Sequence, residues 1–502
     1  MIKIFKSNYY LYFLEFITTF MFGFYLFRFG MNRSFIWLTF SGITLILLIS
    51  EIIFSYRYLK DKKEKIFLLI AIPISLLYSL FLAPYRIMDE TAHLVKNMDL
   101  SNGNLITKKD KENKAIVYVP EGVNEIDDKK IKDFASLDKA LSEKTDYENL
   151  VRVNPFFTYT VINTPTPYLL SALGFKIGIL FNLNFYLSMY LAKLFNILLY
   201  LVVGYWIIKL IPFGKLFMLV YLLNPMLLQG VSSVGADNFT NLISILWISY
   251  ILHLRFRKEK IKNKEIVILS ILMLLVSTSK FIYFSLLLLL LLLKDQYQNH
   301  KQKKVIAISI LLSLVLTGIS IYIGLGYDNE FARFISGNNI DAIKQLKGVI
   351  TKPWNFIIGV VMSIYKYHGD YITEFFGYQL GNTDITLMYG AYLGYIIIFI
   401  ASLFMNKERI ELTKKNRYLL WLTTFILIGC IFGVEYLTWN SVNARIIEGV
   451  QGRYFIPFMI IPCLLMINDK IKISFKNNQF ITVTSLLIIH LLNIFVLFRS
   501  YM

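Results

Sequence analysis

The sequence predicts an all-α protein, built as a polytopic bundle of transmembrane helices. Of its 502 residues, 56% are hydrophobic and 16% are aromatic, and the mean hydropathy is +0.56. Runs of about 20 apolar residues, the length that crosses a bilayer, recur almost from end to end. These runs are continuous rather than alternating, and lipid leaves no backbone polar group unsatisfied, so helices are the expected spanning element.

We expect about thirteen spans, counted as apolar runs between polar breaks. They are 9–29, 34–55, 65–83, 185–208, 216–234, 238–254, 265–279, 281–293, 304–325, 385–404, 417–437, 453–467 and 479–498. The pair 265–279 and 281–293 is short, and one long tilted helix is the alternative, although it would invert the topology that follows. The expected domains are a two-span extension (1–64), a core (65–325), an external loop (326–384) and C-terminal helices (385–502).

The distribution of charge indicates an orientation. With the N-terminus inside, the cytoplasmic segments hold 27 Lys and Arg against 7 Asp and Glu, and the rest of the chain holds 25 against 26. The formal charge of +19 is thus a cytoplasmic +20 and an external −1, as the positive-inside rule requires. The excess of basic residues is explained by the topology and by attraction to anionic lipid, so nucleic acid is not an expected partner. The cytoplasmic segments are 1–8, 56–65, 209–215, 255–264, 294–304, 405–417 and 468–478.

The expected location is therefore the cell membrane, with a cytoplasmic N-terminus and an external C-terminus. Lys3 and Lys6 precede an apolar run that is long for a signal peptide, and no small-x-small cleavage site follows, so an uncleaved anchor is expected. Cys430 and Cys463 both fall within predicted spans. Their positions argue against a disulfide framework and against a zinc site.

Three external regions interrupt the apolar pattern: 84–164, 326–384 and 438–452. The charged middle of the first, beginning with KKDKENK at 108–114, is expected to form a soluble helical insertion. Its apolar, proline-punctuated end at 154–178 is expected to return to the membrane surface as an interfacial or re-entrant helix. All three regions are rich in Tyr, Trp, Phe, Asn and Gln, which bind sugars but also populate any membrane interface.

The first external region opens with two adjacent acids, Asp89 and Glu90, followed by His93. One acid at an outer helix end is usually just solvated. Two acids and a histidine that lead back into apolar sequence favour a functional site instead. A carboxylate at a low-dielectric boundary can act as a general base or hold a divalent metal such as Mg²⁺ or Mn²⁺. Glu90 and His93 face one way on a helix, but their spacing does not fit the His-Glu-x-x-His zinc motif.

Further candidates lie at other outer span ends. Asp237 precedes a predicted span and either caps that helix or belongs to the site. Lys280, Arg445 and Arg453 are cations beside apolar sequence on the outer face, against the inside bias. Each of them either snorkels to the surface or binds an anion such as a lipid phosphate.

These stretches resemble a large family of bacterial membrane proteins of unknown function. MDETAHLVKNMDLSNGNLI resembles its Pro-Asp-Glu-x-x-His signature, with Met88 in place of the usual proline. GVQGRYFIPF at 449–458 resembles its Gly-x-Gln-Gly-Arg-Tyr-x-x-Pro motif, the most specific part of the likeness. NPMLLQGVSSVGADNFTN at 224–241 and LAKLFNILLY at 191–200 look like further family blocks, whereas the two N-terminal spans and the charged insertion look peripheral.

That family in turn resembles the GT-C superfamily of integral membrane glycosyltransferases, which keep an acidic motif in the first large external loop. The likeness implies transfer of a sugar from a polyprenyl-phosphate donor to a cell-envelope glycan or polymer on the outer side of the membrane. It implies that Asp89 is the base and that Glu90 orients it or binds metal, with exchange of the two roles open. The implied substrate contacts are His93, Asp237, Lys280, Arg445, Gln451, Arg453 and Tyr454.

Two other functional classes remain open at this stage. A transporter or flippase for lipid-linked saccharides would carry charged residues in mid-span, facing a pathway, and the predicted span interiors are nearly free of charge. A non-catalytic partner in envelope assembly would tolerate the loss of Asp89.

Overall fold

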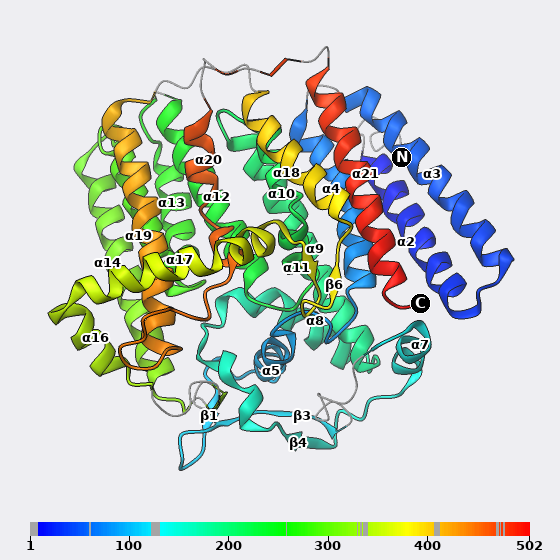
Figure 1. The fold of residues 1–502 in the computed structure, drawn as a ribbon, viewed down its shortest axis with the longest axis horizontal. Coiled ribbons are helices and arrows are strands. Elements are labelled where there is room, and N and C mark those ends of the chain that lie inside the picture. The colour runs from blue at the N-terminus through cyan, green and yellow to red at the C-terminus, as the bar shows by residue number, and fades with distance from the viewer. Residues whose placement is uncertain are drawn as a thin grey trace.

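The computed structural model confirms a mostly helical protein, with upright helices side by side in a wide bundle (Figure 1). The residues that the structure describes are 9–59, 62–121, 131–257, 259–328, 330–331, 334, 340–405, 412–467, 471, 473–474 and 477–502. Lys3 and Lys6 of the predicted anchor, and large parts of the expected cytoplasmic segments 405–417 and 468–478, lie outside these residues.

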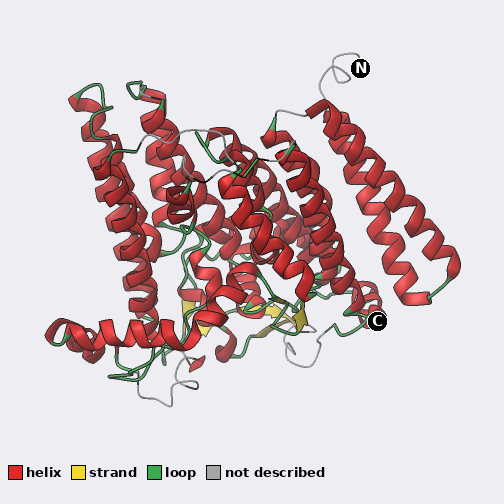
Figure 2. Cartoon of the chain, turned by 45° about the horizontal axis from the view of Figure 1, so that its top comes forward, coloured by secondary structure: helices red, strands yellow, loops and turns green. Residues whose placement is uncertain are grey.

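An antiparallel hairpin begins the described chain. It consists of α2 (Tyr9–Asn32) and α3 (Phe35–Leu59), and α2 packs against α4 (Lys63–Phe81). The turn between α2 and α3 passes through Arg33 in a left-handed conformation, with φ of 47°. The hairpin stands at one side of the bundle (Figures 1 and 2). Most of α3 therefore keeps its apolar side chains on the outside, where lipid covers them.

The buried centre of the bundle is formed by α9 (Phe185–Leu210) and α12 (Asp237–Phe256). The predicted span 216–234 is present but broken into α10 (Lys215–Leu222) and α11 (Pro225–Val231). Asn224 makes the break, because its side-chain oxygen accepts hydrogen bonds from the backbone N–H groups of Met226 (2.8 Å) and Leu227 (3.3 Å). Pro225 then starts the next helix, where its missing N–H is harmless.

The predicted break at 277–280 is also present, since α13 (Asn263–Ser277) ends there and η4 (Phe281–Leu293) begins after it. One continuous helix is therefore ruled out. η4 is a 3₁₀ helix of 13 residues, much longer than such runs usually are. At about 2.0 Å per residue it extends about 26 Å, against about 20 Å as an α-helix. This extension lets a short segment cover most of a bilayer core of about 30 Å.

Eight helices among the described residues are long and apolar enough to cross a membrane. A ninth is added if the bent pair α16 (Ala342–Thr351) and α17 (Pro353–Phe376) counts as one span. A polytopic membrane protein is thus supported, and the count of thirteen stays a prediction. The remaining helices of the bundle are α14 (His300–Leu325), α18 (Tyr389–Phe404), α19 (Lys414–Thr438), η5 (Gly452–Phe455), α20 (Ile460–Met466) and α21 (Asn478–Arg499).

Within the described residues, the charged middle of the first external region is helical only in its later part, which contains α7 (Phe134–Ser142). KKDKENK forms the turn of a β-hairpin instead, in which Lys108–Lys109 (β1) pairs with Ala115–Ile116 (β2). Asp110 drives this turn, because its carboxylate accepts hydrogen bonds from the backbone N–H groups of Glu112 and Lys114, both at 2.9 Å. The other strand pairs are β3 (Tyr118–Pro120) with β4 (Leu150–Arg152) and β5 (Gln379–Leu380) with β6 (Ile385–Thr386).

Helices do occur elsewhere in the external regions. They are α5 (Glu90–Ser101), α7 (Phe134–Ser142), η1 (Pro155–Phe157), η2 (Tyr159–Ile162), η3 (Thr166–Tyr168) and α8 (Leu169–Leu180). The apolar end of the first region thus forms short turns and then a helix. The two helices of the second region, α16 and α17, are bent by 105° to each other, and α17 lies across one end of the bundle (Figures 1 and 2).

The three predicted external regions gather at the same end of the bundle, which is the lower end in Figure 1. The chain directions agree, because α4 ends there, α12 begins there and α13 returns there. The loop between α12 and α13 must then lie at the opposite end. We call the end that holds Asp89 the site end.

Labelling of engineered cysteines tests which end faces outward. An impermeant maleimide should label Glu121→Cys in intact cells, whereas it should label Lys260→Cys only after permeabilisation. Glu121 lies in the first external region and Lys260 in the loop between α12 and α13. Both substitutions belong in a background without Cys430 and Cys463. Equal labelling of both positions in intact cells would contradict the orientation derived from charge.

Candidate functional site

Asp89 occupies a strained position just before α5. Its backbone is left-handed, with φ of 62° and ψ of 0°, a conformation that costs a non-glycine residue about 1–3 kcal/mol. Asp tolerates this region better than most residues. Its carboxylate does not cap α5. It accepts hydrogen bonds from Tyr159 (Oη to Oδ1, 2.9 Å) and from Arg453 (Nη2 to Oδ2, 2.5 Å) instead.

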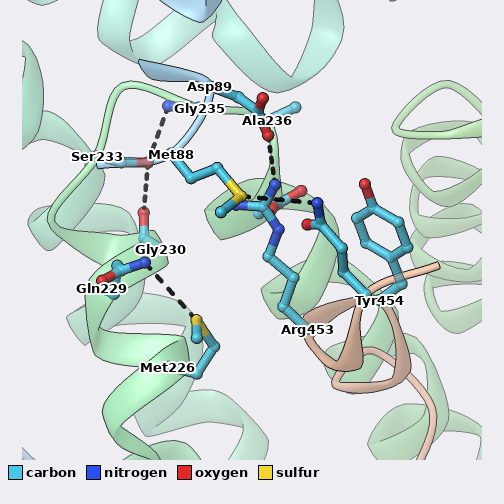
Figure 3. Close-up of polar contacts among 12 residues, drawn as sticks. Met88, Asp89, Met226, Gln229, Gly230, Ser233, Gly235, Ala236, Arg453 and Tyr454 are labelled. Carbon is cyan, nitrogen blue, oxygen red and sulfur yellow. Dashed lines mark hydrogen bonds and ion pairs between the residues drawn. The ribbon is translucent and has the colours of Figure 1, made fainter. Parts of the chain in front are cut away.

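Arg453 lies between two carboxylates that are far apart in sequence. Its Nη2 contacts Asp89 at 2.5 Å and its Nε lies 3.6 Å from Oδ2 of Asp237. Figure 3 shows the guanidinium reaching Asp89, with Tyr454 beside it. The 2.5 Å contact joins the motif before α5 to the turn of η5 across 364 positions of sequence. The two family-like motifs are therefore parts of one site.

Lys280 completes the charge pattern from the turn between α13 and η4. Its Nζ lies 2.6 Å from Oδ1 of Asp237 and 5.4 Å from the ring centre of Tyr454. The Arg453 guanidinium lies 5.7 Å from the same ring. Aromatic faces attract cations at such distances. Asp237 thus lies at the site, and it is not the N-cap of α12, because Ala236 is the N-cap and Asp237 is the first residue of the helix.

The turn of η5 is placed by a glycine. A Cβ on Gly452 would overlap the Tyr371 backbone oxygen and would lie 2.7 Å from the Phe375 backbone nitrogen, so no larger residue fits against α17. The Gly452 N–H donates to the Glu374 carboxylate at 2.5 Å. This close approach explains the Gly-Arg-Tyr sequence: the glycine seats the turn, and the two residues after it reach the carboxylates and cations.

Glu90 points away from Arg453 and into the protein. It forms an ion pair with Lys193 of α9 at 3.3 Å, and both side chains have 0% exposure. It also accepts hydrogen bonds from the backbone N–H groups of Tyr85 (3.0 Å) and Val234 (3.4 Å). Breaking such a buried pair typically costs about 3–5 kcal/mol. Glu90 therefore ties the loop that carries Asp89 to α9 and to the loop before α12.

His93 lies one helical turn beyond Asp89. Its Nδ1 is 2.8 Å from the Tyr168 hydroxyl, and its ring lies against Gly235, where a Cβ would stand 3.1 Å from Cδ2. Burial lowers the pKa of His93 to about 4, although the charges of Asp89 and Asp237 oppose the shift. The imidazole is therefore neutral near pH 7.

The other predicted residues differ in position. Gln451 lies at the site, with Nε2 3.6 Å from the Met88 sulfur and Oε1 buried without a hydrogen-bond partner among the described residues. Arg445 is exposed and takes no part in the contacts described above.

Two small cavities, each with room for one or two waters (about 30 and 20 Å³), adjoin the site. Both are lined by Met88, Met226, Gln229 and Arg453.

Asp89 stays ionised at neutral pH. Burial raises the pKa of this carboxyl, but the charge of Arg453 and the hydrogen bond from Tyr159 outweigh burial, so that its pKa is lowered. Burial also opposes the charge of Arg453, and Asp237 and Asp89 more than compensate, so that its pKa is raised. With Asp89 ionised and Arg453 charged, the positive and negative charges of the site balance one another.

Comparison with known sequences finds one family of membrane proteins. The profile of the family described as "Predicted membrane protein (DUF2142)" matches residues 73–461. The chain belongs to this family. No curated protein and no solved structure matches it. The matched range contains every predicted site residue of this DUF2142 member, and it leaves out α2, α3 and α21.

The residues considered for a divalent metal do not fit one. Glu90 is committed to Lys193, and the Nδ1 of His93 to Tyr168. Among the described residues, no group of three or more His, Cys, Asp and Glu side chains is arranged to hold a metal ion.

Three residues of this site were not among the sequence candidates. Tyr159 binds Asp89 from η2, Lys193 pairs with Glu90, and Glu435 of α19 lies within electrostatic range of Lys280, Asp89 and Arg453. Lys193 and Glu435 carried a signal, because each is a charge inside an apolar span, and such charges are rare and usually paired or functional. Tyr159 carried no such signal in a region rich in tyrosine.

Acidification should destabilise the protein through His93. The unfolded state takes up a proton near pH 6.5 and the folded state only near pH 4, so folded-state stability is lost as the pH falls through this window. His93→Gln should reduce the loss, as measured by the thermal unfolding midpoint in detergent at several pH values. The exposed His368→Gln is the matched control. Identical pH dependence in wild type and His93→Gln would contradict the neutral, buried imidazole.

Proposed function

We propose that this protein transfers a sugar from a polyprenyl-phosphate carrier to a cell-envelope glycan on the outer side of the cytoplasmic membrane. The observation that carries the proposal is the bridge made by Arg453 and Lys280 to Asp89 and Asp237. The reaction needs a cationic place for a lipid phosphate and a carboxylate for an acceptor hydroxyl. Both kinds of group meet here, at the ends of apolar helices.

The cations are already neutralised, so the donor phosphate has to compete for them. Arg453 presents a planar set of N–H donors that suits carboxylate and phosphate alike. A phosphate that takes over Arg453 and Lys280 would release Asp89 and Asp237. Binding of the donor would thus prepare the base, because Asp89 without its guanidinium partner holds a proton more readily.

The proposed step balances in atoms and charge. The acceptor oxygen attacks the anomeric carbon, and the bond from that carbon to the phosphate oxygen breaks. The polyprenyl phosphate leaves with the bonding electron pair, and the acceptor proton goes to Asp89. Lys280 and Arg453 stabilise the charge that develops on the leaving phosphate, in a site that is partly shielded from water. Gln451 and His93 are placed to contact sugar hydroxyls.

Glu90 takes a positioning role in this proposal rather than that of an alternative base. Its carboxylate is fully buried and is held by Lys193 and two backbone N–H groups. Tyr159 orients Asp89 by its hydrogen bond. The water-sized cavities beside Arg453 mean that a sugar enters only after the site opens. The loop that carries Met88 and the β5–β6 hairpin border these cavities.

Replacement of the proposed base tests the function. Asp89→Asn keeps the shape and removes the proton acceptor, so transfer should fall by about a hundred- to ten-thousandfold, the usual worth of general-base catalysis. The measurement is the composition of cell-envelope glycans in a deletion strain that is complemented with each variant at equal expression.

The matched control is Asp370→Asn, an exposed acid on α17 at the same end of the bundle, and it should restore the glycan fully. If Asp89→Asn also restores a normal glycan, the carboxylate is not catalytic, and a non-catalytic role in envelope assembly becomes the better account. If deletion of the gene leaves the envelope glycans unchanged, the proposed function itself fails.

A further inference from the structure

The α2–α3 hairpin carries two acids within its apolar helices. Glu15 lies six residues after the start of α2, and Glu51 lies eight residues before the end of α3. At about 1.5 Å per residue, these positions are about 9 and 12 Å from the same end of the hairpin. The two carboxylates therefore lie at matching depth, in the part of the hairpin farther from the site end.

Glu15 is almost completely buried, with 1% exposure. Both of its carboxylate oxygens, and Oε2 of Glu51, are buried without a hydrogen-bond donor among the described residues. The other Glu51 oxygen accepts a hydrogen bond from the Thr18 hydroxyl at 3.0 Å, and this hydroxyl also bonds to the Leu14 carbonyl at 3.0 Å. Three of the four carboxylate oxygens are thus removed from solvent and have no donor in the described part of the chain.

No described cation neutralises Glu15. Of the charged groups in the described ranges, Glu51 is the one that acts on it, and Glu51 repels it. The charged groups on the elements packed against α2 lie elsewhere: Arg57 is near the end of α3, and Lys63, Glu64 and Lys65 are at the start of α4. The charges of α7 are at the opposite end of α2, where Asp138 lies 3.8 Å from Arg28.

Two ionised carboxylates in this position would be costly. Moving one unpaired carboxylate out of water already costs many kcal/mol, and such groups usually take up a proton instead. Two acids that share a site raise this tendency further, because like charges cannot both ionise there. Protonation of one carboxyl removes the repulsion between the two.

We propose that Glu15 and Glu51 form a reversible proton-binding site inside the membrane. The occupant is a proton rather than a metal ion, because a proton bonds to a single carboxylate oxygen and needs no further ligand. Divalent ions such as Mg²⁺ and Ca²⁺ take six or more oxygen ligands, and the Glu15 carbonyl is already taken by the Thr19 hydroxyl at 2.6 Å. The proton enters from the face opposite the site end, to which the pair lies closer.

This site is separate from the proposed sugar transfer. It lies in the two helices that precede the matched family range of 73–461. Loss of the proton would place two like charges between α2 and α3, so the packing of the hairpin would depend on the pH at that face. The proposal stands whether or not Asp89 is catalytic.

Labelling with dicyclohexylcarbodiimide tests the proposal, since this apolar reagent reacts with protonated carboxyls in membranes. The carboxyl proton moves to a reagent nitrogen while the carboxylate oxygen bonds to the central carbon, so the adduct retains the whole reagent. Peptide mapping of the purified full-length protein should show the adduct on Glu15 or Glu51 near neutral pH. It should decrease as the pH is raised, and E15Q/E51Q should lose it. Glu143→Gln, at an exposed loop position, should not change it.

Two results would overturn the proposal. The first is an unlabelled pair in the folded protein at mildly acidic pH, although the same peptides are labelled after unfolding in detergent. The second is protection by sodium ions at constant pH, which would make the site one for an alkali cation. Because the wild-type peptide map decides both results, the test does not depend on the folding of the double variant.

Discussion

The charge balance of the site depends on the guanidinium of Arg453, held between Asp89 and Asp237. It joins three separate parts of the chain: the strained residue before α5, the first residue of α12 and the turn of η5. Removal of this one cation would leave two carboxylates with only Lys280 to balance them. Packing supports the arrangement, because Gly452 allows the turn to approach α17 and Glu90 anchors the opposite loop on Lys193.

The sequence was a good guide to the residues that meet at the site. Asp89, Asp237, Lys280 and Arg453 were selected because they are charges at outer ends of predicted spans, and span ends on one face must lie at one end of a bundle. Arg445 met the same criterion and is exposed instead. The sequence places Glu90 next to Asp89, but the two side chains do not share surroundings. Successive residues at a helix start point in different directions, and Glu90 turns towards α9.

The irregular parts of the fold could not be predicted from apolar periodicity. The break at Asn224 depends on a side chain that replaces backbone donors locally, and the extended geometry of η4 leaves no mark in a run of leucines. The lysine-rich stretch at 108–114 forms a hairpin turn because Asp110 binds two backbone N–H groups. Charge composition alone suggested a solvated helix there. Lys193 and Glu435 are charges inside apolar spans, but the apolar residues around them do not indicate which groups they contact.

Buried acidic groups follow one physical rule here: each needs a partner of opposite charge or a proton. Glu90 has Lys193. Asp89 and Asp237 share Arg453 and Lys280. Glu15 and Glu51 have no cation among the described residues, and we propose that a proton takes its place. In the proposed function, an anionic lipid that enters the site displaces such a partner, and this exchange would couple lipid binding to the release of a carboxylate.

The most direct test of this exchange is an experimental structure of the protein with polyprenyl phosphate bound in a lipid nanodisc. The account predicts that the phosphate lies against Lys280 and Arg453, and that the contact from Arg453 to Asp89, 2.5 Å in the present state, has opened beyond hydrogen-bonding distance. A phosphate bound elsewhere, with the contact between Arg453 and Asp89 intact, would contradict it.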